Sequence, residues 1–270
     1  MKKPSQLRAK KHLSQNFLTD QNVINKIIKS FDLGKSDHVI EIGPGYGSMT
    51  FPIIEMVDSI DVIELDKDLA NYLNEHDRKG LINVIQADAM RFDFASLKKK
   101  KKIRLIGNLP YHISTPLLFH LLNFSEIFND FHVMVQKEVA ERMCATPQQR
   151  KDYGSLSLAV GLGFDCQTFL NVPPTAFRPI PKVDSSLIFL QPRSSGLEAE
   201  DENKFLEWSR TLFGNRRKLL YGSIKRHFPD WYHKDHNYLQ ESIGKRRPEE
   251  IPQKEWLNLF SRFLSFTKQK

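Results

Sequence analysis

The sequence predicts an α/β fold in which a doubly wound, mostly parallel sheet of seven strands precedes a small all-helical domain. Apolar runs of strand length alternate with stretches of helical spacing between residues 38 and 136, which is typical of a parallel sheet covered by helices on both faces. A glycine-rich turn follows the first of these strands. From Lys204 onward only helical spacing remains.

The predicted elements of the larger part follow one another in a regular order. Residues 23–31 form an amphipathic helix, because their apolar side chains recur at helical spacing. Five strands are then predicted, over residues 38–42, 60–66, 81–86, 103–107 and 131–136. Helices are expected between them, over residues 49–57, 69–75 and 116–124. An antiparallel pair completes the sheet, over residues 164–172 and 185–190.

The composition changes over residues 191–203, where Pro, Ser and Gly are followed by acidic residues, and we interpret this stretch as a linker. Beyond it, four helices are predicted, over residues 205–213, 217–227, 237–243 and 252–266. We therefore expect two domains. Residues 1–195 form the larger one, with a basic arm over residues 1–13, and residues 196–270 form a helical basic one.

The charge of the chain favours a polyanionic partner. The 270 residues include 40 Lys and Arg against 32 Asp and Glu, and the pI is about 9.3. Most of the excess lies at the C-terminal end, where residues 201–270 hold 15 basic and 9 acidic side chains. A basic charge concentrated in one part of a chain is typical of nucleic-acid binding.

Several classes of protein are disfavoured. The two cysteines, Cys144 and Cys166, form no CxxC pair, so we expect no zinc site built on cysteine. No apolar run approaches the length of a membrane span, and the N-terminus lacks the apolar segment of a signal peptide. The sequence therefore predicts a cytoplasmic protein with no membrane association, and nothing in it indicates more than a monomer.

The glycine turn, Gly43-Pro44-Gly45-Tyr46-Gly47, lies between a predicted strand and a predicted helix, where glycines let the backbone approach a ligand closely. Alone it leaves open a dinucleotide-binding fold or a structural turn. The third glycine of the dinucleotide pattern is absent, because Ser48 occupies that position. Glu64 ends the second strand, and a carboxylate there can accept both hydroxyls of a ribose.

Two further strands end in polar residues. Asp88 follows the third strand, and Gly107-Asn108-Leu109-Pro110-Tyr111 follows the fourth. Because the carboxyl ends of parallel strands meet in one crevice, we expect these side chains to lie together there. Asn108 can accept a hydrogen bond from an amino group, and Tyr111 can stack on a base.

This set suits methyl transfer to the exocyclic amine of adenine. The Asn108 side-chain oxygen and the Leu109 carbonyl would accept the hydrogens of N6 and localise its lone pair toward a methyl sulfonium. Preorganised hydrogen bonds of this kind contribute roughly 10²–10³ in rate, and in-line positioning contributes further. The product amine is acidic enough to lose its proton to water, so the chemistry needs neither a general base nor a metal. The base must leave its helix to reach such a pocket.

The chain closely resembles the ribosomal RNA adenine dimethyltransferases. The resemblance is carried by QNFL at 15–18, EIGPGYG at 41–47, VIELD at 62–66, QADAM at 86–90, GNLPYHIST at 107–115, YGSLS at 153–157, VPPTAFRPIPKVDSSL at 172–187 and FGNRRKLL at 213–220. It implies a Rossmann-like class I methyltransferase that uses S-adenosyl-L-methionine. The implied substrate is 16S rRNA in the small ribosomal subunit, where two adjacent adenosines in the hairpin near the 3′ end receive two N6-methyl groups each.

The resemblance also implies roles for individual residues. Those for the cofactor are Asn16 and Leu18 at its methionine end, Gly43 beneath it, Glu64 on the ribose, Asp88 on the adenine amine, and Asn108. Those for the target adenine are Asn108, Leu109, and the sandwiching rings of Tyr111 and Phe177. Those for RNA phosphates are Arg216, Arg217 and Lys218.

The sequence departs from the family pattern at two places. Leu13-Ser14 stands where the family often has Phe-Gly, and His112 stands where it usually has Asn. No general base is needed, so His112 is given no role. Three alternatives remain: a 23S rRNA adenine methyltransferase conferring antibiotic resistance, a non-catalytic RNA-binding assembly factor of the same fold, and, more distantly, a nicotinamide oxidoreductase.

Overall fold

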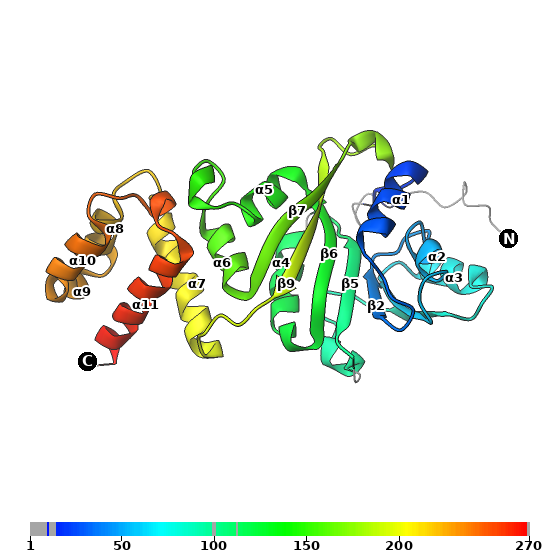
Figure 1. The fold of residues 1–270 in the computed structure, drawn as a ribbon, viewed down its shortest axis with the longest axis horizontal. Coiled ribbons are helices and arrows are strands. Elements are labelled where there is room, and N and C mark those ends of the chain that lie inside the picture. The colour runs from blue at the N-terminus through cyan, green and yellow to red at the C-terminus, as the bar shows by residue number, and fades with distance from the viewer. Residues whose placement is uncertain (1–9, 11–14, 99–100, 112, 269–270) are drawn as a thin grey trace. The chain divides into compact units, whose positions relative to one another are not determined.

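The structure of the chain is a computed structural model that describes residue 10 and residues 15–98, 101–111 and 113–268. Its main feature is a seven-stranded sheet with the order β4-β3-β2-β5-β6-β9-β7 (Figure 1). The strands are β2 (His38–Ile42), β3 (Ile60–Glu64), β4 (Ile82–Gln86), β5 (Ile103–Asn108), β6 (Phe128–Gln136), β7 (Phe164–Val172) and β9 (Ser185–Pro192). The seven strands expected from the sequence are confirmed.

The register of the sheet brings three strand ends together. Strand β2 lies between β3 and β5 and is parallel to both, with Ile42 opposite Ile63 on one side and Gly107 on the other. Strands β4 and β6 continue the parallel arrangement outward, whereas β9 is antiparallel to β6. The glycine turn, Glu64 and Asn108 therefore all lie at the carboxyl edge of the sheet.

Helices connect the strands. They are α1 (Gln21–Ser30), α2 (Thr50–Ile53), α3 (Lys67–His76), α4 (Ser114–Leu122), α5 (Lys137–Met143) and α6 (Ser155–Gly163). Helix α1 begins where it does because the Asp20 side chain accepts the N–H groups of Asn22 and Val23. Its apolar face packs into the core through Ile24, Ile27 and Ile28.

The structure differs from the predicted elements at several places. The helix expected over residues 49–57 is a single turn, α2, with Pro52 inside it, followed by turns. Helices α5 and α6 were not predicted. Helix α7 (Ala199–Phe213) begins inside the expected linker, and α9 (Pro229–Lys234) was also missed.

A small two-stranded sheet joins distant segments of the chain. Strand β1 (Phe17–Leu18) pairs antiparallel with β8 (Phe177–Arg178), with Leu18 opposite Phe177. The Thr19 N–H extends this connection by donating to the Ala176 carbonyl at 2.8 Å. The QNFL segment is thereby fixed to the proline-rich segment.

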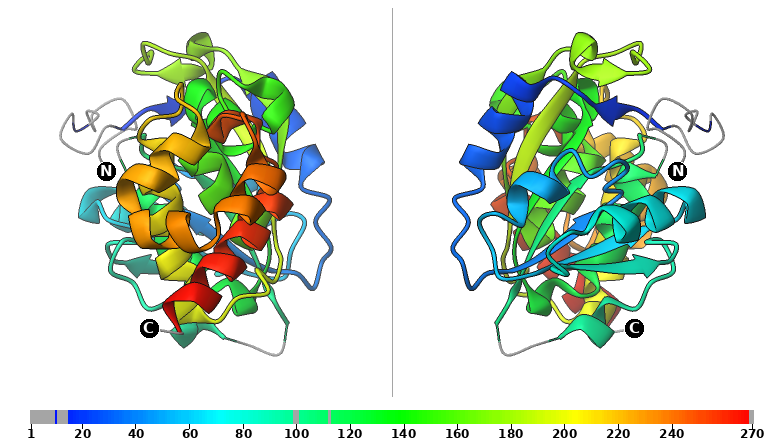
Figure 2. Two further views of the ribbon diagram at one scale, coloured as in Figure 1. Left: turned by 90° about the vertical axis from the view of Figure 1, so that its left-hand side faces the viewer. Right: turned by 90° about the vertical axis from the view of Figure 1, so that its right-hand side faces the viewer.

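The contacts between residues divide the chain into two compact units, residues 1–140 with 166–192 and residues 141–165 with 193–270. The second unit contains α7, α8 (Leu220–His227), α9, α10 (His236–Ile243) and α11 (Gln253–Thr267), coloured yellow to red in the left view of Figure 2. Its core is rich in aromatic residues, among them Trp208, Trp231, Trp256 and Phe260. Within it, the Tyr153 hydroxyl donates to the Ile251 carbonyl at 3.0 Å.

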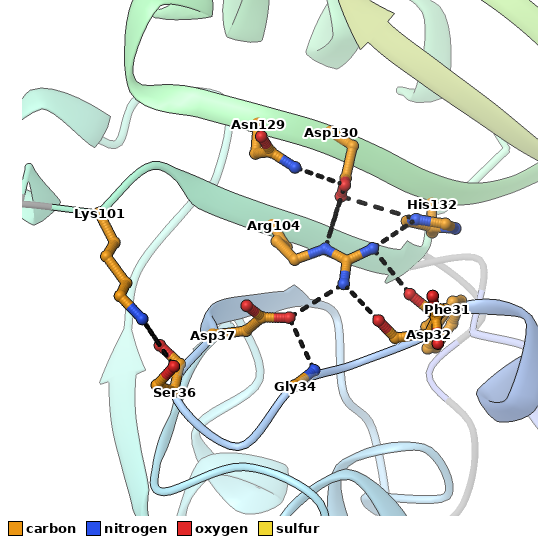
Figure 3. A network of polar contacts seen from close by, with 10 residues as sticks. All are labelled: Phe31, Asp32, Gly34, Ser36, Asp37, Lys101, Arg104, Asn129, Asp130 and His132. Carbon is orange, nitrogen blue, oxygen red and sulfur yellow. Dashed lines mark hydrogen bonds and ion pairs between the residues drawn. The ribbon is translucent and has the colours of Figure 1, made fainter.

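A partly buried arginine organises the amino edge of the large sheet (Figure 3). Arg104 on β5 donates through Nε to both carboxylate oxygens of Asp130 on β6, at 3.1 and 3.0 Å. Its other nitrogens donate to Asp37 and to the carbonyls of Phe31 and Asp32 at the end of α1. The guanidinium thus holds α1 against the sheet at the edge opposite the glycine turn.

Candidate active site

A pocket opens at the carboxyl edge of the sheet, where the ends of β2, β3 and β5 meet the segment around β1. It is lined by Gln15, Asn16, Phe17, Leu18, Glu41, Gly43, Pro44, Gly45, Ser48, Met49, Glu64, Leu69, Asn108, Leu109, Pro110 and Tyr111. Seven residues expected at the site from the sequence are among them: Asn16, Leu18, Gly43, Glu64, Asn108, Leu109 and Tyr111.

The glycine turn forms the floor of the pocket and requires glycine. Gly43, Gly45 and Gly47 have φ values of 67°, 58° and 74°, a region that other residues rarely adopt. A Cβ at Gly45 would lie 2.9 Å from the Phe17 ring, and one at Gly47 would lie 2.5 Å from Phe51. The turn therefore keeps its backbone exposed to the pocket and closely covered by Phe17.

Glu64 is anchored by the backbone on both of its oxygens. Its Oε2 accepts the Gly45 N–H at 3.2 Å, and its Oε1 accepts the Asp66 N–H at 2.9 Å. The side chain is 6 % exposed. Burial raises the pKa of the Glu64 carboxyl, and the two N–H groups act in the opposite direction. Each oxygen keeps a lone pair for a further donor such as a ribose hydroxyl.

Glu41 is a second pocket carboxyl that was not predicted from the sequence. The Thr50 hydroxyl donates to its Oε2 at 2.6 Å, whereas Oε1 is buried without a hydrogen bond among the described residues. The pKa of Glu41 is raised to about 7, chiefly by burial; the bond from Thr50 opposes this rise, and the charge of Glu64 adds to it. The available signal was a lone acid in an apolar strand, two residues before the first glycine of the turn.

The GNLPY segment supplies the opposite wall. The Asn108 side chain donates through Nδ2 to the Asn16 carbonyl at 3.0 Å, which leaves Oδ1 as an acceptor. Leu109 is held by its N–H, which donates to the Met134 carbonyl at 3.1 Å. Tyr111 shares a hydrogen bond of 2.7 Å with the Ser185 hydroxyl, so its ring is fixed at the rim. Burial raises the pKa of Tyr111, and it remains protonated at neutral pH.

The segment before β1 is attached beside Glu64. Gln15 donates through Nε2 to Asp66 Oδ2 at 3.0 Å, and the Lys10 ammonium donates to Asp66 Oδ1 at 2.6 Å. Burial alone would raise the pKa of Asp66, but the bonds from Lys10 and Gln15 outweigh it and lower the pKa. Phe17 follows, its ring 4.6 Å from that of Tyr46. The rest of the predicted arm lies outside the described residues.

Two expected site residues do not line the pocket. Asp88 follows β4 and accepts the Met90 N–H at 2.9 Å. Phe177 is fully buried in the main hydrophobic core, with Leu18 and Ala176. His112 lies outside the described residues.

The three cations expected to contact RNA have different surroundings. Arg216 donates to Glu249 Oε2 at 3.0 Å and to the carbonyls of Arg150 and Lys151 at 2.6 and 2.9 Å. Arg217 and Lys218 are exposed. The structure therefore gives Arg216 a packing role within the second unit, and it leaves Arg217 and Lys218 open to solvent.

The residues present fit a cationic nucleoside cofactor. Two carboxyls face the pocket, and its lining contains no Lys, Arg or His among the described residues. Glu64 suits a ribose diol, and the orphaned Oε1 of Glu41 suits a cation or a donor.

Across the described residues there is no cluster of three or more His, Cys, Asp or Glu that could hold a metal. Nor does any described helix have the length and apolarity needed to span a bilayer.

Comparisons with known proteins agree with this chemistry. A family model described as ribosomal RNA adenine dimethylase matches residues 6–264. A ribosomal RNA small subunit methyltransferase A from Dechloromonas aromatica is 43% identical over 218 residues, 80% of this chain and 84% of that protein. One from Saccharophagus degradans is 39% identical over 262 residues, 93% of each chain.

Solved structures show the same fold. A dimethyladenosine transferase from Plasmodium falciparum superposes with a TM-score of 0.77 at 25% identity, covering 93% of this chain and 98% of that one. The 23S rRNA methyltransferase ErmE superposes with a TM-score of 0.70 at 24% identity, covering 92% and 99%.

Proposed function

The chain belongs to the ribosomal RNA adenine dimethylases, and from this premise we propose that it acts on 16S rRNA in the small ribosomal subunit. The reaction is dimethylation of N6 on two adjacent adenosines in the hairpin near the 3′ end, with S-adenosyl-L-methionine as the methyl donor. The chain is thus an rRNA adenine dimethyltransferase, and its work on ribosomal subunits places it in the cytoplasm.

One observation carries the proposal for the chemistry: the glycine turn, Glu64 and the GNLPY segment line a single pocket. A nucleoside-binding carboxylate and an amine-binding amide are thereby brought to opposite walls. The bond from Asn108 Nδ2 to the Asn16 carbonyl orients the amide so that Oδ1 can accept a hydrogen from N6.

The cofactor site consists of the floor and one wall of the pocket. Glu64 accepts the ribose hydroxyls, Gly43 allows close approach of the backbone, and Asn16 and Leu18 cover the methionine end. Asp88 binds the adenine amine from the turn after β4. When bound, S-adenosylmethionine supplies an electrophilic methyl group on a sulfonium.

The target adenine enters from the rim. Asn108 Oδ1 and the Leu109 carbonyl accept the N6 hydrogens, which directs the nitrogen lone pair into the pocket. Tyr111 stacks on the base, which contributes about 1–3 kcal/mol. Phe177 completes a sandwich only if it leaves the core in which it is buried, so Tyr111 carries the larger part of this role.

The choice of 16S over 23S rRNA rests on the relatives. Those 39–43% identical are named small subunit methyltransferases, whereas ErmE is 24% identical and supports the fold alone. Residues 1–195 would carry out methyl transfer, and the basic helical part, residues 196–270, would contact RNA phosphates through Arg217 and Lys218.

The proposal is tested by incubating the protein with unmodified small subunits and S-adenosylmethionine, and then mapping the product by mass spectrometry. We expect two neighbouring dimethyladenosines near the 3′ end of 16S rRNA. Methylation of 23S rRNA instead would overturn the assigned substrate. Absence of transfer to either RNA would favour the assembly-factor alternative.

A further inference from the structure

We propose that the ionised side chain of Glu41 lets the pocket distinguish the cationic cofactor from its spent product. This inference rests on the proposed use of S-adenosylmethionine. That molecule carries one net positive charge at neutral pH, because its sulfonium and ammonium outnumber its carboxylate. Transfer of the methyl group removes the sulfonium charge, so S-adenosylhomocysteine carries none. A nearby carboxylate attracts the first more than the second.

The position of Glu41 meets the geometric requirement. Its side chain is 1 % exposed and lies in the pocket lining, one residue from the end of β2. Oε2 is held by Thr50 on α2, and Oε1 has no partner among the described residues. A buried carboxylate oxygen without a partner is unfavourable in an empty pocket. It becomes favourable beside a bound cation.

Among the residues that the structure describes, the neighbours of Glu41 carry no compensating charge. Its partners across the ladder, Val62 on β3 and Ile106 on β5, are apolar. The groups that act on its charge are the Thr50 hydroxyl and the Glu64 carboxyl. Lys10, which contacts the segment after β3, is paired with Asp66 and Asp68.

The two pocket carboxyls accept different numbers of hydrogen bonds, and this difference determines which of them is protonated more readily. Glu64 accepts two backbone N–H groups, which stabilise its ionised form. Glu41 accepts a single hydroxyl. Two buried carboxyls of like charge titrate apart, and the less supported one keeps its proton longer. Burial raises the pKa of Glu41 to about 7, so it is partly protonated in the empty pocket at neutral pH.

The expected pH dependence follows from the sign of the linkage. A bound cation lowers the pKa of Glu41 more than an uncharged ligand does. Well below neutral pH Glu41 is protonated with either ligand, and the preference for S-adenosylmethionine is smallest. As pH rises toward and past 7 the carboxylate forms, and the preference grows to its maximum. The ratio of the two dissociation constants changes in total by tenfold for each unit by which the pKa of Glu41 differs between the two complexes.

The test is to measure the dissociation constants of S-adenosylmethionine and S-adenosylhomocysteine by calorimetry between about pH 5.5 and 8. In the wild-type protein we expect the ratio of the two constants to change by about tenfold across this range. In the Glu41→Gln variant, the ratio of the two constants should no longer show that change with pH. Titration of each ligand's own ammonium is common to both proteins and cancels in the comparison. The matched control is Glu55→Gln, an exposed carboxyl outside the pocket.

A second variant keeps the carboxyl. Thr50→Val removes the hydroxyl that lowers the pKa of Glu41, so the midpoint of the ratio should move to higher pH. The same pH profile in wild type, Glu41→Gln and Thr50→Val would overturn the role of Glu41 and leave the proposed function intact. A wild-type protein that binds neither ligand would contradict the proposed cofactor itself.

Discussion

At the scale of single residues, Asn108 lies in the wall of the proposed cofactor site and also supplies the oxygen that accepts a hydrogen from the target amine. Because its Oδ1 is aligned by the bond to the Asn16 carbonyl, Asn108→Ala should lower the methylation rate by roughly 10²–10³. Its affinity for small subunits should be nearly unchanged, since the phosphate contacts lie elsewhere. Single-turnover methylation and filter binding measure the two quantities separately.

The control for this variant is Asn25→Ala, which removes an exposed amide on α1 that bonds only locally to Gln21. It should leave both quantities unchanged. A parallel fall of rate and RNA affinity in Asn108→Ala would show that Asn108 is a packing residue rather than the acceptor.

How far single residues could be predicted depended on whether their role is local. Gly43, Glu64 and Asn108 each lie at the end of a strand, so the pattern of strand ends was sufficient to place them in the pocket. Phe177 could not be placed this way, because its burial depends on pairing with Leu18, which is about 160 residues distant. Arg216 looked like a free cation in the sequence, since its partner Glu249 lies far along the chain.

At the scale of elements, the pairing of β1 with β8 sets Phe177 opposite Leu18, and both side chains are buried in the main core. Phe177→Ala should lower the free energy of unfolding by about 3–5 kcal/mol, because it removes a fully buried aromatic side chain. Phe169→Ala is the matched control, since that ring is 59 % exposed on β7 and its loss should matter little. Chemical denaturation measures both. Equal stability of the two variants would contradict the buried position of Phe177.

The Arg104 network joins α1, β5 and β6, and it gives a second prediction at this scale. Arg104→Met leaves Asp130, 4 % exposed, as a buried charge without its main partner, and should cost about 3–5 kcal/mol. The double variant Arg104→Met/Asp130→Leu removes that charge and should recover part of the loss. Denaturation of both variants tests this. A double variant no more stable than Arg104→Met alone would show that the unpaired charge of Asp130 is not the cause.

Elements were predicted well where each had its own periodicity and poorly where it did not. Strand β2 has the bounds that its apolar run indicates, and α1, expected over residues 23–31, spans Gln21–Ser30. Helix α6 is apolar around its whole circumference, so it has no amphipathic period by which to recognise it. Helix α9 is too short to show one.

At the scale of the whole molecule, the second unit is built from two separate stretches of sequence. Residues 141–165 contribute Tyr153, Leu158 and Leu162 to the aromatic core that the C-terminal helices complete. A fragment of residues 1–195 should therefore expose these side chains and self-associate, although it contains every pocket residue. Size-exclusion chromatography beside the full chain measures this. A monodisperse fragment would favour folding in two consecutive domains instead.

The bond between Tyr153 and Ile251 spans 98 residues, and this has a consequence for synthesis. During translation at about 5–20 residues per second, Tyr153 would wait about 5–20 s before its partner is made. Apolar side chains of residues 141–165 lack their packing partners through that interval. We therefore expect the nascent chain to be most prone to aggregation and chaperone capture late in elongation, and ribosome profiling of chaperone-bound chains would locate that window.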